Sequence, residues 1–598
     1  MAAIDLTSGT AGAYGAGELQ LQNKVQMTST LTPVTDNLNV ASPLLLSTDS
    51  VTNRGLANEV GSTAYGTTAL RSTTSGIDNT AIGYNALNAD TTGSSNTAVG
   101  HESLLLTTTG NHNTALGRHA LRLNLLGTGN TGIGSMALRA NSTGTGNTAL
   151  GYLAMENNTN SNNTALGYRS LRANTSGSYN VGVGVDALLN NTSASNNVAV
   201  GGLSLTQNNT GTGNIGIGFR SLLNSNSNFN VAIGSDAQQT LTSGSSNVSI
   251  GVNSLFSNTT GSNNTSIGHN SLLNNTASNN TALGYESAFS NTTGDTQIAI
   301  GYQSLRTNTT GAGNTAIGYQ SLFTNNGDRN VAIGRYSAFL QTNANDNTVI
   351  GDSALTSNIT GSNNVAVGRL SLYNNTASNN TAVGFEAGYS NTSGVEVTAV
   401  GFQALRNSTG VGNTALGHQS GIVTTTGTYN TFLGGAVAVS NTTGSDNTAV
   451  GQGTLYTNVG GNNNVAVGRT ALFNNTASNN TAVGFEAGFS NSSGVALTAI
   501  GFRSLKNNTT GVYNTAFGFN CLSDNTTGNN NIAIGGDQAS ANFGNCIMFG
   551  RGDTATANAQ VRFGSAAVPT SPVVAGANVS TQYWEVFING TAYKILLA

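Results

Sequence analysis

Several residue types that define common protein classes are scarce in this chain of 598 residues. Only 7% of the residues are charged, and the sequence contains 4 prolines, 2 cysteines and 1 tryptophan. Disordered chains of low hydrophobicity usually carry a high net charge, whereas the net charge here is −4. With 78 glycines and so few prolines, collagen is excluded as well. Two cysteines, Cys521 and Cys546, cannot form a disulfide framework, and we expect both to be small buried thiols.

Sequence features that would indicate particular partners are also missing. No cluster of Lys and Arg could follow a phosphate backbone, so we expect no nucleic-acid partner. No apolar run approaches the ~18 residues that cross a membrane, so we expect no membrane insertion. The start, Met1-Ala2-Ala3-Ile4-Asp5, has no basic segment followed by an apolar one. This predicts a chain that has no Sec-type signal and is made and folded in a cytosol.

The sequence is instead dominated by a short motif, Asn-Thr/Val-Ala-Ile/Val/Leu-Gly. Complete copies are Asn79-Thr80-Ala81-Ile82-Gly83 and Asn96-Thr97-Ala98-Val99-Gly100. The motif glycines from Gly66 to Gly550 number 30, so the mean period is (550 − 66)/29, or about 16.7 residues. Because a helical hairpin repeat needs at least ~33 residues, this period indicates one turn of a β-solenoid. At about 4.8 Å per coil, the 29 steps predict an elongated shaft roughly 140 Å long.

Each coil is predicted to contain two short strands. The motif alternates with period 2, which places Thr/Val and Ile/Val/Leu on one side and Ala and Gly on the other. The segment Tyr84-Asn85-Ala86-Leu87 is predicted as a second strand, and residues 88–95 as a polar turn. The sequence therefore predicts an all-β parallel β-solenoid or β-roll of about 30 coils over residues 62–550.

Stacking the motifs produces two columns of small residues. The invariant glycine column begins with Gly83, Gly100, Gly117, Gly134 and Gly151. The Ala column begins with Ala81, Ala98, Ala115, Gly132, Ala149 and Ala165. Small side chains along a strand face indicate that another backbone lies close. A tight single-chain roll would explain the Ala column, and so would a close-packed axis between chains. We favour the axis, because association would hide a second face, and we predict a homotrimeric fibre.

Residues with catalytic or metal-binding chemistry form no pattern of their own. The five histidines are scattered along the repeats, at His101, His112, His119, His269 and His418. Three of them share the position after the motif glycine, but Tyr, Phe and Arg hold that position in other coils. We therefore expect no enzyme, no cofactor and no metal site. Ice binding stays an alternative, although each motif offers one Thr where an ice-binding face would want Thr-x-Thr.

The repeated units resemble the head repeats of trimeric autotransporter adhesins of the YadA type. That family's fold is a left-handed parallel β-roll in a three-chain bundle, and the resemblance covers about residues 62–535. The repeat is longer here than is usual for that family, and we see no secretion signal, coiled-coil stalk or membrane-anchoring barrel strands. In these respects the chain resembles bacteriophage tail fibres, which carry repetitive trimeric shafts. Residues 37–48 and 583–597 are similar to segments of such virion proteins.

The two ends lack the motif. We expect residues 1–61 to be an attachment or capping region and residues 551–598 to be a C-terminal β tip or trimerisation cap, since a solenoid needs a different unit to cover its last coil. The pair Asn589-Gly590 between alternating apolar runs predicts a hairpin. Aromatic residues are enriched at binding patches, so we consider as possible receptor contacts Trp584, Tyr583 and Tyr593.

Together these features predict a non-enzymatic structural and adhesive fibre. We expect a phage tail or side fibre in the virion, joined through one terminus to the baseplate or another tail protein. The other end or the coil edges would bind a glycan or protein of the host surface, and three copies would strengthen weak contacts. An exported bacterial surface adhesin or extracellular filament subunit is the alternative.

Overall fold

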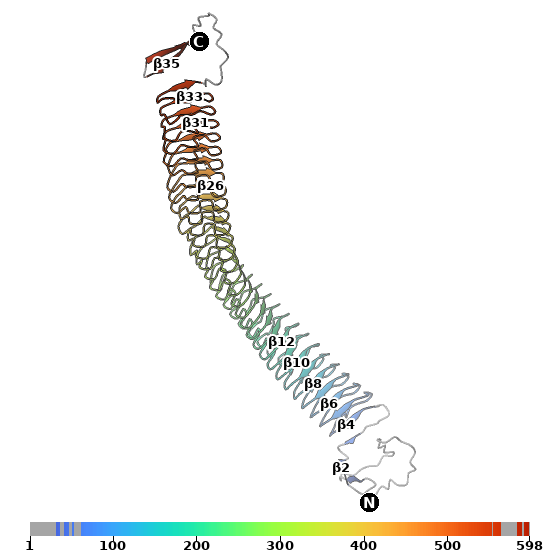
Figure 1. Ribbon diagram of the computed structural model, residues 1–598. Helices are drawn as coiled ribbons and strands as arrows, with labels where there is room; N and C mark the ends of the chain where they lie inside the picture. The colour runs from blue at the N-terminus through green and yellow to red at the C-terminus, as the bar shows by residue number, and fades with distance from the viewer. Residues whose placement is uncertain are drawn as a thin grey trace, which may run out of the picture. The chain divides into compact units, whose positions relative to one another are not determined.

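The computed structural model describes residues 61–552 and 554–563, and the backbone of five strands outside these ranges. Those strands are β1 (Thr32–Thr35), β2 (Ala41–Leu46), β3 (Val51–Thr52), β35 (Tyr583–Ile588) and β36 (Thr591–Leu596). The chain forms two compact units, Met1–Thr212 and Gly213–Ala598. In each unit, three-residue strands follow one another as the coils of a solenoid (Figure 1). The described residues contain no helix.

The solenoid strands of the first unit are β4 (Thr63–Tyr65), β5 (Thr80–Ile82), β6 (Thr97–Val99), β7 (Thr114–Leu116), β8 (Thr131–Ile133), β9 (Thr148–Leu150), β10 (Thr164–Leu166), β11 (Val181–Val183) and β12 (Val198–Val200). Those of the second unit are β13 (Ile215–Ile217), β14 (Val231–Ile233), β15 (Val248–Ile250), β16 (Thr265–Ile267), β17 (Thr281–Leu283), β18 (Ile298–Ile300), β19 (Thr315–Ile317), β20 (Val331–Ile333), β21 (Thr348–Ile350), β22 (Val365–Val367), β23 (Thr381–Val383), β24 (Thr398–Val400), β25 (Thr414–Leu416), β26 (Thr431–Leu433), β27 (Thr448–Val450), β28 (Val465–Val467), β29 (Thr481–Val483), β30 (Thr498–Ile500), β31 (Thr515–Phe517), β32 (Ile532–Ile534), β33 (Ile547–Phe549) and β34 (Val561–Phe563).

Within each unit, successive solenoid strands pair in parallel and in register, so that equivalent residues of the motif stack. Between β5 and β6, Ala81 pairs with Ala98 and Ile82 with Val99. The same register recurs in the second unit, as between β18 and β19. The predicted all-β parallel solenoid is thereby confirmed. The parallel ladder also continues past the predicted end at residue 550, because β33 pairs with β34.

The predicted second strand at residues 84–87 is wrong, because this segment is a turn. Asn85 and Leu87 have left-handed φ angles of 53° and 51°, which no regular strand contains. The segment still bonds like a strand: the Asn85 amide donates to Thr67 O in the preceding coil, and the Leu87 amide donates to Ser103 O in the following one, both at 3.0 Å. These bonds offset the cost of leucine at positive φ, and they let the chain reverse direction within a few residues.

The interior of most coils is filled by the Ala column and by a column of leucines from this turn. The alanines Ala81, Ala98, Ala115, Ala149 and Ala165 are all 0% exposed in the single chain. At Gly132 of the same column, an added Cβ would lie 3.2 Å from Leu121 Cγ. The interpretation of this column as an axis between chains is therefore wrong. The group that keeps it small is a leucine of the same chain, and the alternative of a tight single-chain roll is correct.

The motif glycines are required by both conformation and space. Gly83 has φ of +132°, and a Cβ there would lie 2.5 Å from Gly100 O in the next coil. No L side chain fits a contact this short, which lies far inside van der Waals distance. The glycine column predicts that another stretch of backbone lies close to it, and this backbone belongs to the following coil.

The motif asparagine precedes the strand and is buried, although the sequence gives no sign of its burial. Asn96 Oδ1 accepts from the Asn113 backbone N at 3.0 Å and from Asn113 Nδ2 at 3.1 Å. The same Nδ2 donates to Gly127 O at 2.8 Å across the coil. A second ladder runs beside the first, where Asn141 Nδ2 donates to Asn124 Oδ1 at 2.7 Å. In both ladders the asparagine side chains form hydrogen bonds with backbone groups of the turns that have no strand partner. These buried polar groups are therefore hydrogen-bonded, as buried polar groups generally are.

The ends of the chain add antiparallel pairs to this parallel stack. β3 pairs antiparallel with β4, and β1 with β2. β35 and β36 pair antiparallel with Ile588 opposite Thr591, so the predicted hairpin is confirmed. The loop residues Asn589 and Gly590 lie outside the described residues. The side chains of the proposed receptor contacts lie outside them too, namely those of Tyr583, Trp584 and Tyr593.

Candidate functional site

The residue after each motif glycine lies on the outside of its coil, and we call these residues the corner column. In-register stacking brings like side chains together there. The rings of Tyr285 and Tyr302 have centroids 5.2 Å apart and planes inclined by 11°, and Tyr302 and Tyr319 follow at 5.1 Å and 7°. Tyr302 is 42% exposed. Because the ring faces cover one another, the stack offers ring edges to solvent and not flat platforms.

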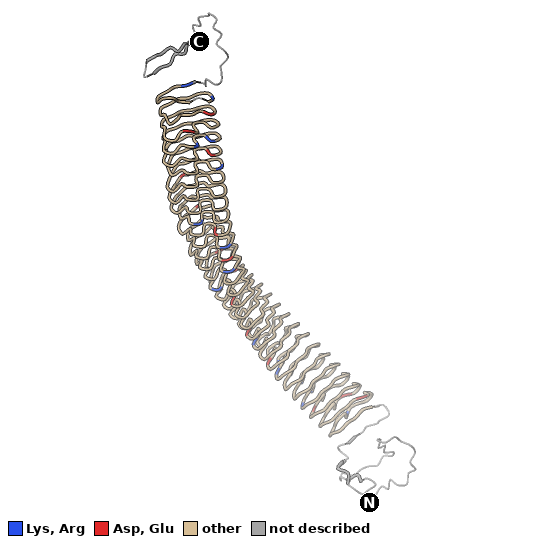
Figure 2. Tube along the Cα trace, in the orientation of Figure 1, with Lys and Arg blue, Asp and Glu red and all other residues tan. Residues whose placement is uncertain are grey.

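The next residue along each coil forms a second column, in which carboxylates pair with basic residues of a neighbouring coil, as Glu286 does with Arg306 and Asp186 with Arg169. Charged residues are sparse along the described coils (Figure 2). Glu286 Oε2 accepts from Arg306 Nε at 2.7 Å and from Gln303 Nε2 at 2.9 Å. Burial alone would raise the pKa of Glu286, but hydrogen bonds from Arg306, Gln303 and Tyr285 bring that pKa below its usual range. The carboxylate therefore stays ionised and ties two coils together.

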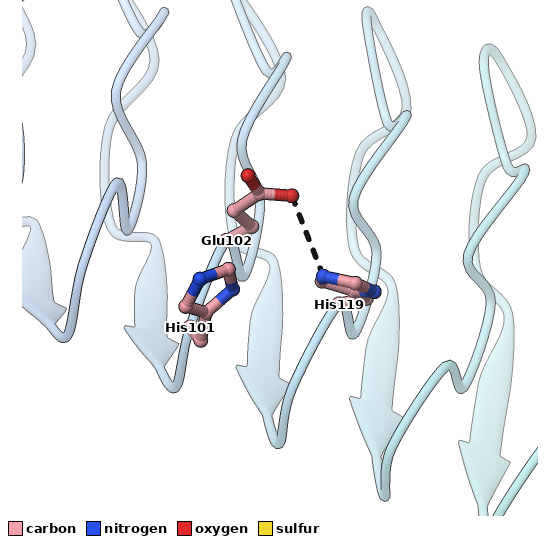
Figure 3. Close-up of side chains that lie close together, drawn as sticks. All are labelled: His101, Glu102 and His119. Carbon is pink, nitrogen blue, oxygen red and sulfur yellow. Dashed lines mark ion pairs between the residues drawn. The ribbon is translucent and has the colours of Figure 1, made fainter.

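The same two columns bring His101, Glu102 and His119 together in the first unit (Figure 3). His101 holds the corner position after Gly100, Glu102 is the next residue, and His119 stacks on Glu102 from the following coil. His119 Nε2 lies 3.4 Å from Glu102 Oε2. One ligand atom from each of the three side chains can be chosen so that all lie within 4.8 Å of one another. Among the described residues, this is the one group of three His, Cys, Asp or Glu residues so arranged.

Neighbouring residues set the charge of this cluster. Arg122 Nε lies 2.6 Å from Glu102 Oε2, and this hydrogen bond lowers the pKa of the carboxyl group despite its partial burial. The pKa of His119 is lowered by burial first and then by the nearby Arg118. At neutral pH the cluster therefore presents a carboxylate and a neutral imidazole at His119, which are the protonation states that bind metal ions.

Sequence reasoning missed this cluster. His101 and His119 are 18 residues apart, which matches no local metal-binding motif. In a solenoid whose local period is 17, however, 18 residues means one coil plus one position, so Glu102 and His119 fall in the same column. A search for ligand pairs at the repeat length, or one residue either side of it, would find the cluster.

The two cysteines lie in the interior of the coils. Cys521 and Cys546 are both 0% exposed, which confirms the expectation of buried thiols. Burial raises the pKa of Cys521 to about 12, so this thiol is unreactive at neutral pH.

Comparisons with known proteins leave the family open. No family model matches the chain, and no curated protein is significantly similar to it. The part of the chain that the structure describes has no helix long and apolar enough to cross a membrane.

Proposed function

We propose that this chain is a non-enzymatic structural and adhesive fibre protein, with a phage tail or side fibre as its best interpretation. The observation that carries the proposal is the in-register stacking of short coils. Each coil contacts only its neighbours, so a spacer of this kind lengthens by adding coils. The repetition of one outer arrangement supports such growth: Glu386 accepts from Arg406 at 2.6 Å and from Gln403 at 2.9 Å, as Glu286 does 100 residues earlier.

Exposed apolar residues support association of the fibre into a homotrimer. The last strand residue of the motif points outward, and it is 47% exposed at Leu116 and 43% exposed at both Leu150 and Leu166. Exposed aromatic residues of the corner column lie in the same coils, as at Tyr152 and Tyr168. Apolar columns repeated over many coils exceed the scattered exposure that is normal for a monomer. The proposed contact between chains is thus this outer face and not the Ala column.

The two ends would attach the fibre to its partners. We propose that residues 1–61 join the virion baseplate or another tail protein. Within this region β3 lies antiparallel along the edge of β4, and covering an edge in this way prevents open-ended pairing. Residues 551–598 would form the tip, with Trp584, Tyr583 and Tyr593 as the proposed contacts to a glycan or protein of the host surface.

Two experiments test this proposal. Light scattering on the purified chain should give about three times 60.4 kDa, and a single species at the mass of one chain would overturn the trimer. Immunogold labelling with antibodies raised against residues 61–563 should decorate the tails of virus particles. Labelling of bacterial envelopes, with none on particles, would overturn the phage assignment in favour of an exported adhesin.

A further inference from the structure

We propose that His101, Glu102 and His119 form a binding site for a divalent transition metal ion, with Zn²⁺ as the reference ion. The ion would join two successive coils of the first unit. This inference does not depend on the fibre proposal, because it concerns the surface of a single chain.

The donor set and its spacing fit such an ion. Two imidazoles and one carboxylate form a common three-ligand zinc set, in which the fourth position is left to water or another ligand. With metal–ligand bonds of about 2.05 Å, the edge of a tetrahedral site is about 3.3 Å. His119 Nε2 and Glu102 Oε2 already lie 3.4 Å apart. Two of the three ligand atoms are thus placed along one edge of the required polyhedron.

His101 must complete the site, and its position allows this. Its imidazole is exposed and stacks on Tyr84 with centroids 5.1 Å apart. Its ring centroid lies 5.5 Å from that of His119. Since the ligand atoms are at most 4.8 Å apart, rotation of this exposed side chain can close the remaining gap. The open coordination position would then face solvent.

Arg122 both supports and weakens the site. Its hydrogen bond to Glu102 Oε2 orients the carboxylate, as partners of ligating carboxylates commonly do. For the metal to bind Glu102 Oε2, it must share this oxygen with Arg122 or displace the hydrogen bond. The positive charges of Arg118 and Arg122 oppose a divalent cation, so we expect weaker binding than at closed structural zinc sites with four protein ligands.

The chain contains a natural control in its second unit. There Glu286 binds Arg306 as Glu102 binds Arg122, and His269 holds the corner position one coil earlier, stacked on Tyr285. This set has a carboxylate, an arginine and one histidine but lacks the second imidazole. If the pair of imidazoles makes the site, metal binding must depend on His119 and must not depend on His269.

The test is calorimetric titration of the untagged full-length chain with Zn²⁺. We expect one Zn²⁺ per chain, with affinity reduced by at least about tenfold in His101→Ala, His119→Asn and Glu102→Gln and unchanged in His269→Ala. Circular dichroism spectra would check that each variant is folded, and His101→Ala changes only an exposed side chain. A wild-type chain that binds no Zn²⁺, or one whose binding survives His101→Ala and His119→Asn unchanged, would overturn the proposal.

Discussion

The ring of Phe432 occupies space that a leucine fills in other coils, beside Gly421. A Cβ atom on Gly421 would lie 2.8 Å from Phe432 Cδ2, and Phe432 is 1% exposed. In an earlier coil the equivalent positions hold Leu121 and Gly132, which are also 11 residues apart. There the first residue is large and the second is small, which is the reverse of Gly421 and Phe432. In these two coils the large residue has moved from one position to the other, so the pair as a whole fills the space and not either residue alone.

This exchange predicts strong coupling between the two positions. Phe432→Ala should leave a cavity and cost about 3–5 kcal/mol. Gly421→Leu should overpack the coil and cost about 1–3 kcal/mol. The double variant restores the common pair, and leucine tolerates the required φ, as Leu121 does at 51°. It should therefore be more stable than Phe432→Ala. Hydrogen exchange of the amides around β26 would measure this, and additive effects would contradict the shared-volume argument.

The adjacent glycines 434 and 435 should differ strongly in how much stability is lost when each is replaced by alanine. Gly434 has φ of +137°, and an added Cβ would lie 2.9 Å from the carbonyl carbon of Gly451. At Gly435 an added Cβ would meet no atom within 4 Å. We expect Gly434→Ala to cost about 2 kcal/mol or more through strain, and Gly435→Ala to change stability by less than about 0.5 kcal/mol. Urea denaturation compares the two, and equal midpoints would show that the glycine column is not sterically required.

Replacement of asparagine by aspartate should be much more costly in the buried ladder than at a neighbouring exposed position. Asn364 Nδ2 donates to Ala377 O at 3.0 Å, and Asn364 Oδ1 accepts from the Asn380 amide at 3.0 Å. Asn363 beside it is exposed. Asn364→Asp removes the donor and buries a carboxylate, so it should cost more than about 2 kcal/mol at neutral pH. Asn363→Asp should cost much less. Thermal melts at matched pH check this, and similar melting temperatures would contradict a structural role for the ladder.

The sequence of this chain predicts the length of the repeat well, but it does not show which segments pack against one another. The recurrence of Gly83 and its equivalents predicts the parallel stack, because only glycine fits a backbone so close. The small size of Ala81 indicates a close neighbour without saying whose it is, and the neighbour proves to be the chain's own leucine column.

The wrong second strand has a similar cause. Tyr84-Asn85-Ala86-Leu87 alternates large and small residues as a strand would, and nothing in a leucine predicts φ of 51°. That conformation is imposed by hydrogen bonds to the coils on either side. The His101–Glu102–His119 cluster was missed because it depends on the local coil length to within a single residue.

Asp90 predicts an unusual dependence of stability on pH. It is fully buried and replaces the asparagine of the second ladder, which is Asn124 or Asn141 in later coils. Its Oδ1 accepts from the Gly93 amide at 3.0 Å. Burial raises the pKa of Asp90 from 3.8 to about 7, more than the hydrogen bond from Gly93 lowers it. The folded chain therefore holds this proton more tightly than the unfolded chain does.

The sign of the effect follows from linkage. Below about pH 4 the carboxyl is protonated in both states and costs nothing. As pH rises from about 4 to about 7 the unfolded state gains from ionisation, so the folded chain should lose stability, by at most about 4 kcal/mol. Above about pH 7 the loss should level off. Asp90→Asn should remove this loss and leave the variant more stable than wild type at pH 8, whereas Asp78→Asn, at an exposed position, should not. Hydrogen exchange of amides near Gly93 at pH 4.5 and pH 8, corrected for intrinsic rates, measures the difference. Parallel pH profiles for wild type and Asp90→Asn would mean that the carboxyl reaches solvent or another partner when it ionises.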